Sequence, residues 1–242
     1  MIKTLSIVVA TVLACYLLYV SYFFSEDRQD MVCNDLQVIV KDSLDKHFVT
    51  EGDLTRLLEQ AELNPIGQLI TEVNTELIEQ ELLKNEMISQ VEAYKTPSGI
   101  VKLEVTQKIP ILRVMGVNGN YYVDNLGTLM PISRRYAAHV PIASGYVEKE
   151  LAMNDLYKFA LFLQENKFWN DQIEQIYITS DGDVELIPRV GDHRIVLGTF
   201  DGFEEKLANL RLFYQQAIPK IGWEKYSSIN LKYKNQIVCT KR

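Results

Sequence analysis

Side chains that could act as nucleophiles, bases or metal ligands are scattered through this sequence and form no recognisable motif. The three histidines, His47, His139 and His193, are far apart in the chain and lie beside predicted turns or strand ends. At such positions a surface or capping role is commoner than metal binding or catalysis. The chain also has no Gly-x-Ser-x-Gly elbow, no Cys-x-x-Cys or His-Glu-x-x-His pair and no glycine-rich phosphate loop. We therefore predict a protein that is not an enzyme and has no cofactor, no metal and no small-molecule substrate.

Carboxylates are numerous, and two of them on separate loops could supply the acid and base of a glycosidase. The visible clusters instead follow the polar faces of predicted helices, as in Glu76, Glu79 and Glu81 or in Glu204 and Glu205. Residues of this kind are usually solvated and pair with neighbours three or four positions away. The sequence favours solvated helix faces and leaves an anchored envelope enzyme acting on peptidoglycan as an alternative.

The three cysteines are too few for a disulfide framework. Cys15 falls within the most apolar segment, and Cys33 and Cys239 stand at opposite ends of the remaining chain. One bridge between Cys33 and Cys239 is permitted in an oxidising compartment, but two unpaired, small hydrophobic side chains are the simpler interpretation.

The overall composition indicates a folded chain that does not bind nucleic acid. Hydrophobic residues make up 47% and charged residues 24% of the 242 positions, an ordinary globular balance. The net charge of -7 would repel a polyphosphate backbone, and no run of Lys and Arg interleaved with aromatics is present.

The segment Leu5–Phe24 contains no charged residue and is predicted to be a transmembrane helix in contact with the lipid bilayer. About 20 apolar residues are needed to cross a bilayer core of ~30 Å. Lys3 precedes the segment and acidic residues follow it, so we expect Met1–Thr4 to be a cytoplasmic tail and the rest to be extracytoplasmic. A cleaved signal peptide or a lipoprotein signal at Cys15 are alternatives, but the apolar run continues through Tyr16–Phe24, which favours an uncleaved anchor.

After a short linker, the pattern predicts a compact β-α-α-β-β unit. Leu36–Val40 reads as a strand, and Thr50 begins a helix whose first turn contains an acidic residue. A second helix starts near Asn74. Ile88–Lys95 and Ile100–Gln107 then read as a β-hairpin that directs Val101, Leu103 and Val105 inward. Helices are expected to cover one face of this small mixed sheet.

A larger mixed β domain with two helices is predicted to start at Lys108. Pro110 cannot donate to a central ladder, and the segments after it read as a meander of short strands separated by turn signals. Asp201 and Glu204 suggest a capping box at the start of the second helix. The apolar stripes of the two helices are Leu156, Phe159, Ala160 and Leu163, and Phe203, Leu207, Leu210, Tyr214 and Ala217.

The chain closes with a predicted hairpin whose last strand is open on one side. If Lys234–Gln236 form the loop, Tyr233 faces Ile237 and Leu231 faces Cys239. The terminal strand is then the last in its sheet, and such an edge is either covered or used to dock another chain's strand. For Tyr233, a half-buried place in the strand and a place in an interface are both open.

Several segments of the chain together resemble the FtsQ/DivIB family of bacterial cell-division proteins. The match is spread over essentially the whole chain, and no single motif carries it alone. The segments that carry the resemblance are Phe48–Asp53, Gln107–Pro110, Tyr121–Pro131, Val140–Gly145, Ile195–Gly198 with Glu205–Leu207, and Ile229–Tyr233.

This resemblance implies an α+β protein with a tail (1–4), a transmembrane helix (5–24), a linker (25–34), a POTRA-like domain (35–107) and an FtsQ-type β domain (108–242). It implies a non-catalytic scaffold at the division septum of the bacterial inner membrane, with FtsB-like and FtsL-like partners. A POTRA-bearing assembly or secretion component is a further alternative. The partner-binding residues implied by position, besides residues of the late helix, are Tyr233, Ile237, Val238, Cys239 and Thr240.

Overall fold

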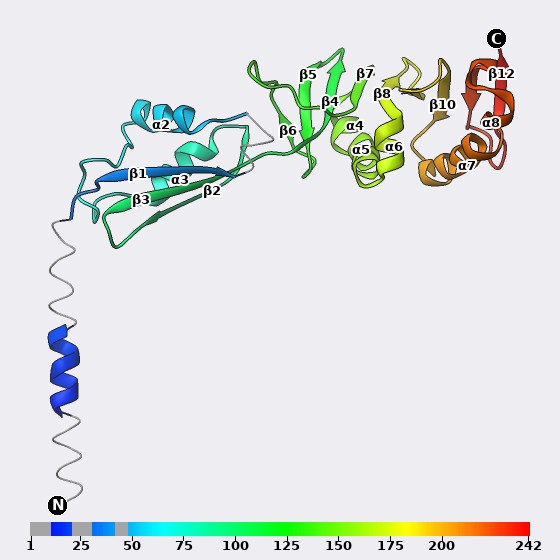
Figure 1. Ribbon diagram of the computed structural model, residues 1–242. Helices are drawn as coiled ribbons and strands as arrows, with labels where there is room; N and C mark the ends of the chain where they lie inside the picture. Colours follow the sequence, from blue (N-terminus) through cyan, green and yellow to red (C-terminus); the bar gives the residue numbers. More distant parts are fainter. Residues whose placement is uncertain (1–10, 21–30, 42–47) are drawn as a thin grey trace, which may run out of the picture. The chain divides into compact units, whose positions relative to one another are not determined.

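The computed structural model describes residues 11–20, 31–41 and 48–242 (Figure 1). Of the segment Leu5–Phe24, the structure describes residues 11–20, which are helical, and the rest of this predicted membrane span lies outside the described residues. Within the described ranges, no helix combines the length and the hydropathy required to cross a bilayer. The chain divides into two compact units, Met1–Gln107 and Lys108–Arg242.

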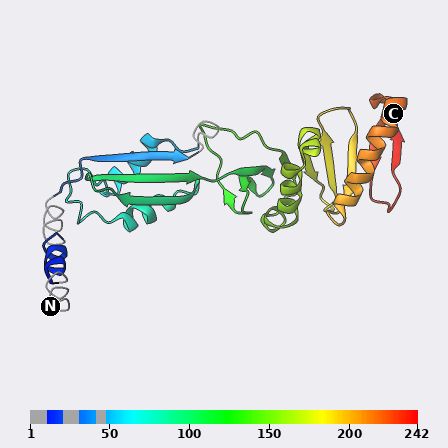
Figure 2. The ribbon, with the colours of Figure 1, turned by 60° about the horizontal axis from the view of Figure 1, so that its bottom comes forward.

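The first unit contains a three-stranded sheet with the order β1-β3-β2. β1 runs parallel to β3, and β2 runs antiparallel to it, so the sheet is mixed as predicted. Figure 2 shows these three strands side by side. The elements, in the predicted β-α-α-β-β order, are β1 (Asp35–Lys41), α2 (Glu51–Gln60), α3 (Thr75–Leu83), β2 (Ile88–Lys95) and β3 (Ile100–Gln107).

Local signals explain where these elements begin and which residues they bury. The Thr50 hydroxyl accepts a hydrogen bond from the Asp53 N–H, and the Asp53 carboxylate accepts one from the Thr50 N–H, which together form a capping box at α2. The Asn74 side chain caps α3 by accepting from the Leu77 N–H at 3.1 Å. On β3, the predicted inward residues Val101, Leu103 and Val105 are fully buried.

The second unit is built on a nine-stranded sheet with the order β12-β11-β10-β9-β8-β7-β4-β5-β6. Its strands are β4 (Pro110–Gly116), β5 (Gly119–Asp124), β6 (Leu129–Met130), β7 (Ile142–Gly145), β8 (Ile173–Ile178), β9 (Val184–Pro188), β10 (Arg194–Gly198), β11 (Tyr226–Asn230) and β12 (Val238–Lys241). Its helices are α4 (Lys149–Met153), α5 (Asp155–Glu165), α6 (Lys167–Gln172), α7 (Phe203–Gln216) and α8 (Ile218–Ile221), with a 3-10 turn at Trp223–Lys225.

The predicted larger mixed β domain is confirmed for this unit, but the expected meander of strands and the expected number of two helices are wrong. β7 is parallel to β4 and β8, and β10 is parallel to β11. Parallel neighbours require a crossover, which α4–α6 provide between β7 and β8, and α7–α8 between β10 and β11. The additional helices α4, α6 and α8 have five, six and four residues, too few to show a periodic apolar stripe in the sequence.

The two predicted apolar stripes form the core of the second unit. Leu156, Phe159, Ala160 and Leu163 of α5 are all buried, as are Leu207, Leu210 and Tyr214 of α7. The ring of Phe159 packs against those of Phe200 and Phe203, with centroids 5.4 Å and 5.1 Å apart. These aromatic contacts hold the start of α7 against α5.

The predicted capping box at the start of α7 is wrong. The residue that precedes the helix is Gly202, whose φ of 62° is left-handed, and it offers no side chain as a cap. Asp201 therefore stands outside the capping position, and its carboxylate accepts a hydrogen bond from the Thr199 hydroxyl at 3.1 Å.

Candidate functional site

The strand β12 is the last strand of the nine-stranded sheet, as predicted. It pairs with β11, and no other strand in the described part of the chain covers its second edge. In an edge strand, backbone N–H and C=O groups on the outer side are free to bind another extended chain. This open edge is the candidate functional site.

The predicted register of the terminal hairpin is wrong. Cys239 faces Ile229 instead of Leu231, so the pairing is shifted by two residues. The Leu231 N–H donates to the Val196 carbonyl oxygen at 2.8 Å, so the contact with β10 continues one residue beyond the end of β11. The loop between the two strands is residues 231–237, which is longer than the predicted three-residue loop Lys234–Gln236.

Two of the five predicted site residues therefore lie in this longer loop. Tyr233 is 56% exposed and belongs to no strand, so the alternative of a half-buried strand aromatic is wrong. Ile237 is half-buried and packs against the core of the unit. The loop thus presents one exposed aromatic ring beside one anchored aliphatic side chain.

The other three predicted site residues belong to β12 and alternate along it. Val238 is 45% exposed, and Thr240 is also exposed. Cys239 between them is half-buried against the core, and this burial raises the pKa of its thiol. Cys239 and Cys33 are both free in the structure. The strand therefore offers Val238 and Thr240 outward, while Cys239 secures it to the unit.

A cavity of about 210 Å³ separates the loop from the first turns of α7. Leu231 and Ile237 contribute apolar side chains to the wall of the cavity, and the exposed Tyr233 also lines it. The full lining consists of Asp201, Gly202, Glu205, Lys206, Asn209, Leu231, Lys232, Tyr233, Lys234, Asn235, Gln236 and Ile237. A side chain of a docked strand could be held here, next to the open edge.

Two lysines fix the walls of this cavity. The Lys206 ammonium donates to the carbonyl oxygens of Leu197 and Thr199 at 3.1 Å and 2.9 Å, and burial lowers the pKa of Lys206. The Lys232 ammonium pairs with the Asp183 carboxylate at 2.7 Å, which raises the pKa of Lys232. Neither pairing follows from a local sequence pattern, because the partners lie seven and nine residues from Lys206 and 49 residues from Lys232.

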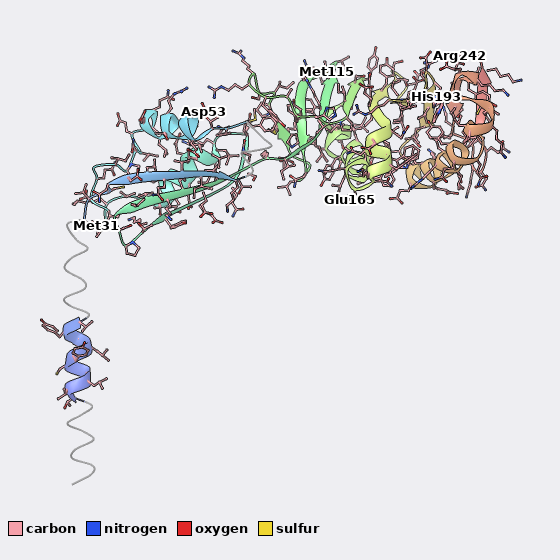
Figure 3. All side chains as sticks on the ribbon, viewed as in Figure 1. Met31, Asp53, Met115, Glu165, His193 and Arg242 are labelled. Atoms are coloured by element: carbon pink, nitrogen blue, oxygen red, sulfur yellow. The ribbon has the colours of Figure 1, made fainter. Side chains whose placement is uncertain are left out.

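The end of β12 is held by Arg242. Its guanidinium pairs with the carboxylates of Asp192 at 2.6 Å and Glu224 at 3.4 Å, and also donates to the Asp192 carbonyl oxygen. Its N–H donates to the Lys225 carbonyl oxygen at 3.3 Å. Figure 3 shows Arg242 and His193 at the same end of the second unit. Sequence reasoning missed this arrangement, which fixes the strand at the end remote from the loop.

His193, for which a surface or capping role was predicted, is buried beside Arg242. Its Nε2 shares a hydrogen bond of 2.7 Å with the Tyr214 hydroxyl, and its ring stacks on Trp223 at 5.8 Å. Burial lowers the pKa of His193 and the Arg242 charge lowers it further, while Asp192 opposes them. His139 is exposed, and His47 lies outside the described residues. In the part of the chain that the structure describes, no group of three or more His, Cys, Asp or Glu residues could hold a metal ion.

Comparison with known proteins identifies both units. Residues 109–240 match the family described as FtsQ/DivIB, C-terminal related, and residues 31–106 match the POTRA-like domain. The Cell division protein FtsQ of Rhodothermus marinus is 25% identical to this chain over 187 residues, which cover 71% of this chain and 67% of that protein. The first match alone spans more than half of the chain. The chain therefore belongs to the FtsQ/DivIB-related family of cell-division proteins.

Proposed function

We propose that this protein is a non-catalytic scaffold of the bacterial division machinery that binds a partner by strand addition to β12. The observation that carries the proposal is the open edge of β12, the last strand of the nine-stranded sheet. Membership of the FtsQ/DivIB-related family supports the division role. The partners we propose are FtsB-like and FtsL-like membrane proteins at the septum.

The proposal includes a membrane anchor at Leu5–Phe24. This segment of 20 residues carries no charge, which is the length and composition that a helix needs to cross a bilayer core of ~30 Å. Lys3 before it and acidic residues after it favour a cytoplasmic Met1–Thr4 and an extracytoplasmic remainder. The two units would then work outside the inner membrane, at the division septum.

Strand addition assigns different roles to the predicted site residues. Backbone groups of β12 would supply affinity, with each hydrogen bond contributing about 0.5–1.5 kcal/mol net. Val238 and Thr240 would contact side chains of the added strand, and Tyr233 with Ile237 would hold one partner side chain at the cavity. Cys239 would act indirectly, because it packs against the core. A partner that folds on binding loses several kcal/mol to ordering, so we expect modest affinity.

The experiment is co-purification of the full chain from its own cells, with and without Ile237–Arg242. Small membrane partners should be recovered with the full chain and lost from the truncated one. Because truncation also removes the Cys239 and Arg242 contacts, two point variants separate binding from folding. Val238→Asp places a charge on the open edge, at a side chain that is 45% exposed. Val117→Asp is the matched control, because it places the same charge in the β4–β5 turn, at a side chain that is 66% exposed.

We expect Val238→Asp to weaken partner recovery by at least about tenfold, equivalent to ~1.4 kcal/mol, and Val117→Asp to leave it unchanged. Unchanged recovery with Val238→Asp and with the truncated chain would contradict the proposal.

A further inference from the structure

Residues 31–34 of the first unit lie between two loops and form one surface with them. The Cys33 N–H donates to the Gln68 carbonyl oxygen and the Ile70 N–H to that of Met31, both at 2.8 Å, and the Asn34 N–H donates to the Gly99 carbonyl oxygen at 2.9 Å. These bonds join residues 31–34 to residues 64–72 and to the β2–β3 turn at residues 95–100. We refer to these three segments as the N-terminal surface.

The N-terminal surface carries almost no charge and exposes large aliphatic side chains. Of its 19 residues, Glu72 and Lys95 alone are charged, in a chain of which 24% is charged. Val32 and Ile66 are 40% and 50% exposed. A shallow cavity of about 240 Å³ on this surface is lined by Met31, Ile70, Thr71, Lys95, Thr96 and Pro97. Few charges have to be desolvated when such a surface leaves water, which favours an interfacial contact.

The N-terminal surface is also held in one shape. Gly99 has a φ of 76°, and a Cβ at this position would lie 3.1 Å from both the Met31 side chain and the Val32 carbonyl oxygen. The β2–β3 turn therefore packs directly on the incoming chain. The backbone hydrogen bonds and this close packing therefore hold the three segments in fixed positions relative to one another.

The length of the connecting chain points to the partner of this surface. Six residues, Ser25–Asp30, separate the proposed anchor from Met31, and six residues span at most about 20 Å in any conformation. The N-terminal surface thus cannot leave the neighbourhood of the bilayer. Tethering at this range gives a high effective concentration, so a few apolar contacts are enough to populate a bound state.

We infer that the N-terminal surface rests on the bilayer interface. Val32, Ile66 and Pro97 enter the boundary between headgroups and acyl chains, and the Lys95 ammonium extends to lipid phosphates. The inference rests on the proposed membrane anchor and adds to it a second contact, which orients the first unit on the membrane.

Photo-crosslinking of the full chain in vesicles tests this contact. A benzophenone amino acid is placed at Ile66, and a matched chain carries it at Leu83, which is 47% exposed against 50% for Ile66. Leu83 ends α3 and precedes the start of β2, whereas the N-terminal surface adjoins the end of β2. In vesicles of phosphatidylethanolamine and phosphatidylglycerol, we expect position 66 to give several-fold more lipid adduct than position 83, as measured by mass spectrometry.

Equal or negligible lipid adducts at both positions would overturn the inference. It would also be overturned if position 66, in cells, crosslinked to another protein and formed no lipid adduct. Carbonate extraction of the same vesicles separates this failure from failure of the anchor. A chain that resists extraction but gives no lipid adduct at position 66 retains the proposed anchor and loses the surface contact. A chain that is extracted loses the anchor itself.

Discussion

At the scale of the residue, Arg242 joins β12 to two segments that lie elsewhere in the sequence. Its guanidinium contacts Asp192 in the β9–β10 connection and Glu224 in the 3-10 turn. Ion pairs on a surface contribute little to global stability, typically ~0–1 kcal/mol. Their effect here is local, because they fix the end of a strand that has only one neighbouring strand in the described sheet.

Arg242→Ala is therefore expected to reduce the free energy of unfolding by no more than about 1 kcal/mol and to speed hydrogen exchange of the β12 amides. The check is native-state hydrogen exchange, with Lys241→Ala as the matched control because Lys241 is exposed and adjacent. Exchange at β12 that is equal in both variants would show that Arg242 does not hold the strand.

His193 provides a pH-dependent contribution to stability at the same place. Because its pKa is lowered in the folded protein, the unfolded chain binds a proton first as the pH falls. The contribution is complete above the ordinary pKa of 6.5 and is lost as the pH falls below 6.5 toward the lowered folded value. Arg242, Asp192 and Tyr214 are the charged or titratable groups nearest to the ring.

His193→Gln should thus lose less stability than the unaltered protein between pH 7.5 and pH 5.0, because Gln does not titrate in this range. Urea unfolding at both pH values measures the two losses, and their difference isolates His193 from the carboxylates common to both chains. Identical losses would exclude the buried histidine as a source of pH dependence.

At the scale of the element, the crossover strands are the feature that the sequence pattern could least predict. β7 has four residues and lies between β4 and β8, both parallel to it. At its end, Gly145 has a φ of 87°, and a Cβ there would overlap the Ile178 carbonyl oxygen. Gly182 has a similar φ of 84° but open space around it.

Gly145→Ala should accordingly destabilise the second unit by more than Gly182→Ala, for which the positive φ alone costs about 1 kcal/mol. We expect a difference of at least ~2 kcal/mol, because β7 and β8 must separate to admit the methyl group. Chemical denaturation of the two variants measures this difference, and equal losses would mean that the crossover tolerates an extra carbon at this point.

The loop between β11 and β12 makes its contribution through Tyr233. Its ring is 56% exposed, so Tyr233→Ala should change the free energy of unfolding by less than about 0.5 kcal/mol. Loss of an interface tyrosine should weaken partner binding by about tenfold. Affinity measurements with the co-purified partner test this, with Tyr146→Ala as the matched control because Tyr146 is 53% exposed and lies outside the cavity lining, and an unchanged affinity would remove Tyr233 from the site.

Elements of this chain that are specified locally were predictable from sequence. The caps at Thr50 and Asn74, the hairpin at residues 88–107 and the stripes of α5 and α7 depend on neighbouring residues. The register of the terminal hairpin was not predictable, because the turn residues do not fix the length of the loop and β11 is also paired with β10, a strand distant in the sequence. The contacts of His193 with Tyr214 and of Arg242 with Asp192 were missed because they join segments that are far apart in the sequence. The open edge of β12 was predictable. The cavity beside the β11–β12 loop and the ion pairs of Arg242 at the other end of β12 were not.

At the scale of the whole molecule, the chain combines an apolar N-terminal segment, a POTRA-like unit and an FtsQ/DivIB-related unit. In the proposed division of roles, the first two parts contact the membrane and the third binds the partner. The nine-stranded sheet has two end strands, β12 and β6. β6 has two residues and β12 has four, so β12 offers the longer ladder for an added strand.

Hydrogen exchange of the full chain, with and without its co-purified membrane partner, tests strand addition most directly. We predict strong protection of the amides of Val238–Lys241 in the complex and unchanged exchange at Leu129–Met130 of β6, the opposite edge of the same sheet. Protection at β6, or β12 amides that exchange equally fast with and without bound partner, would contradict strand addition at β12.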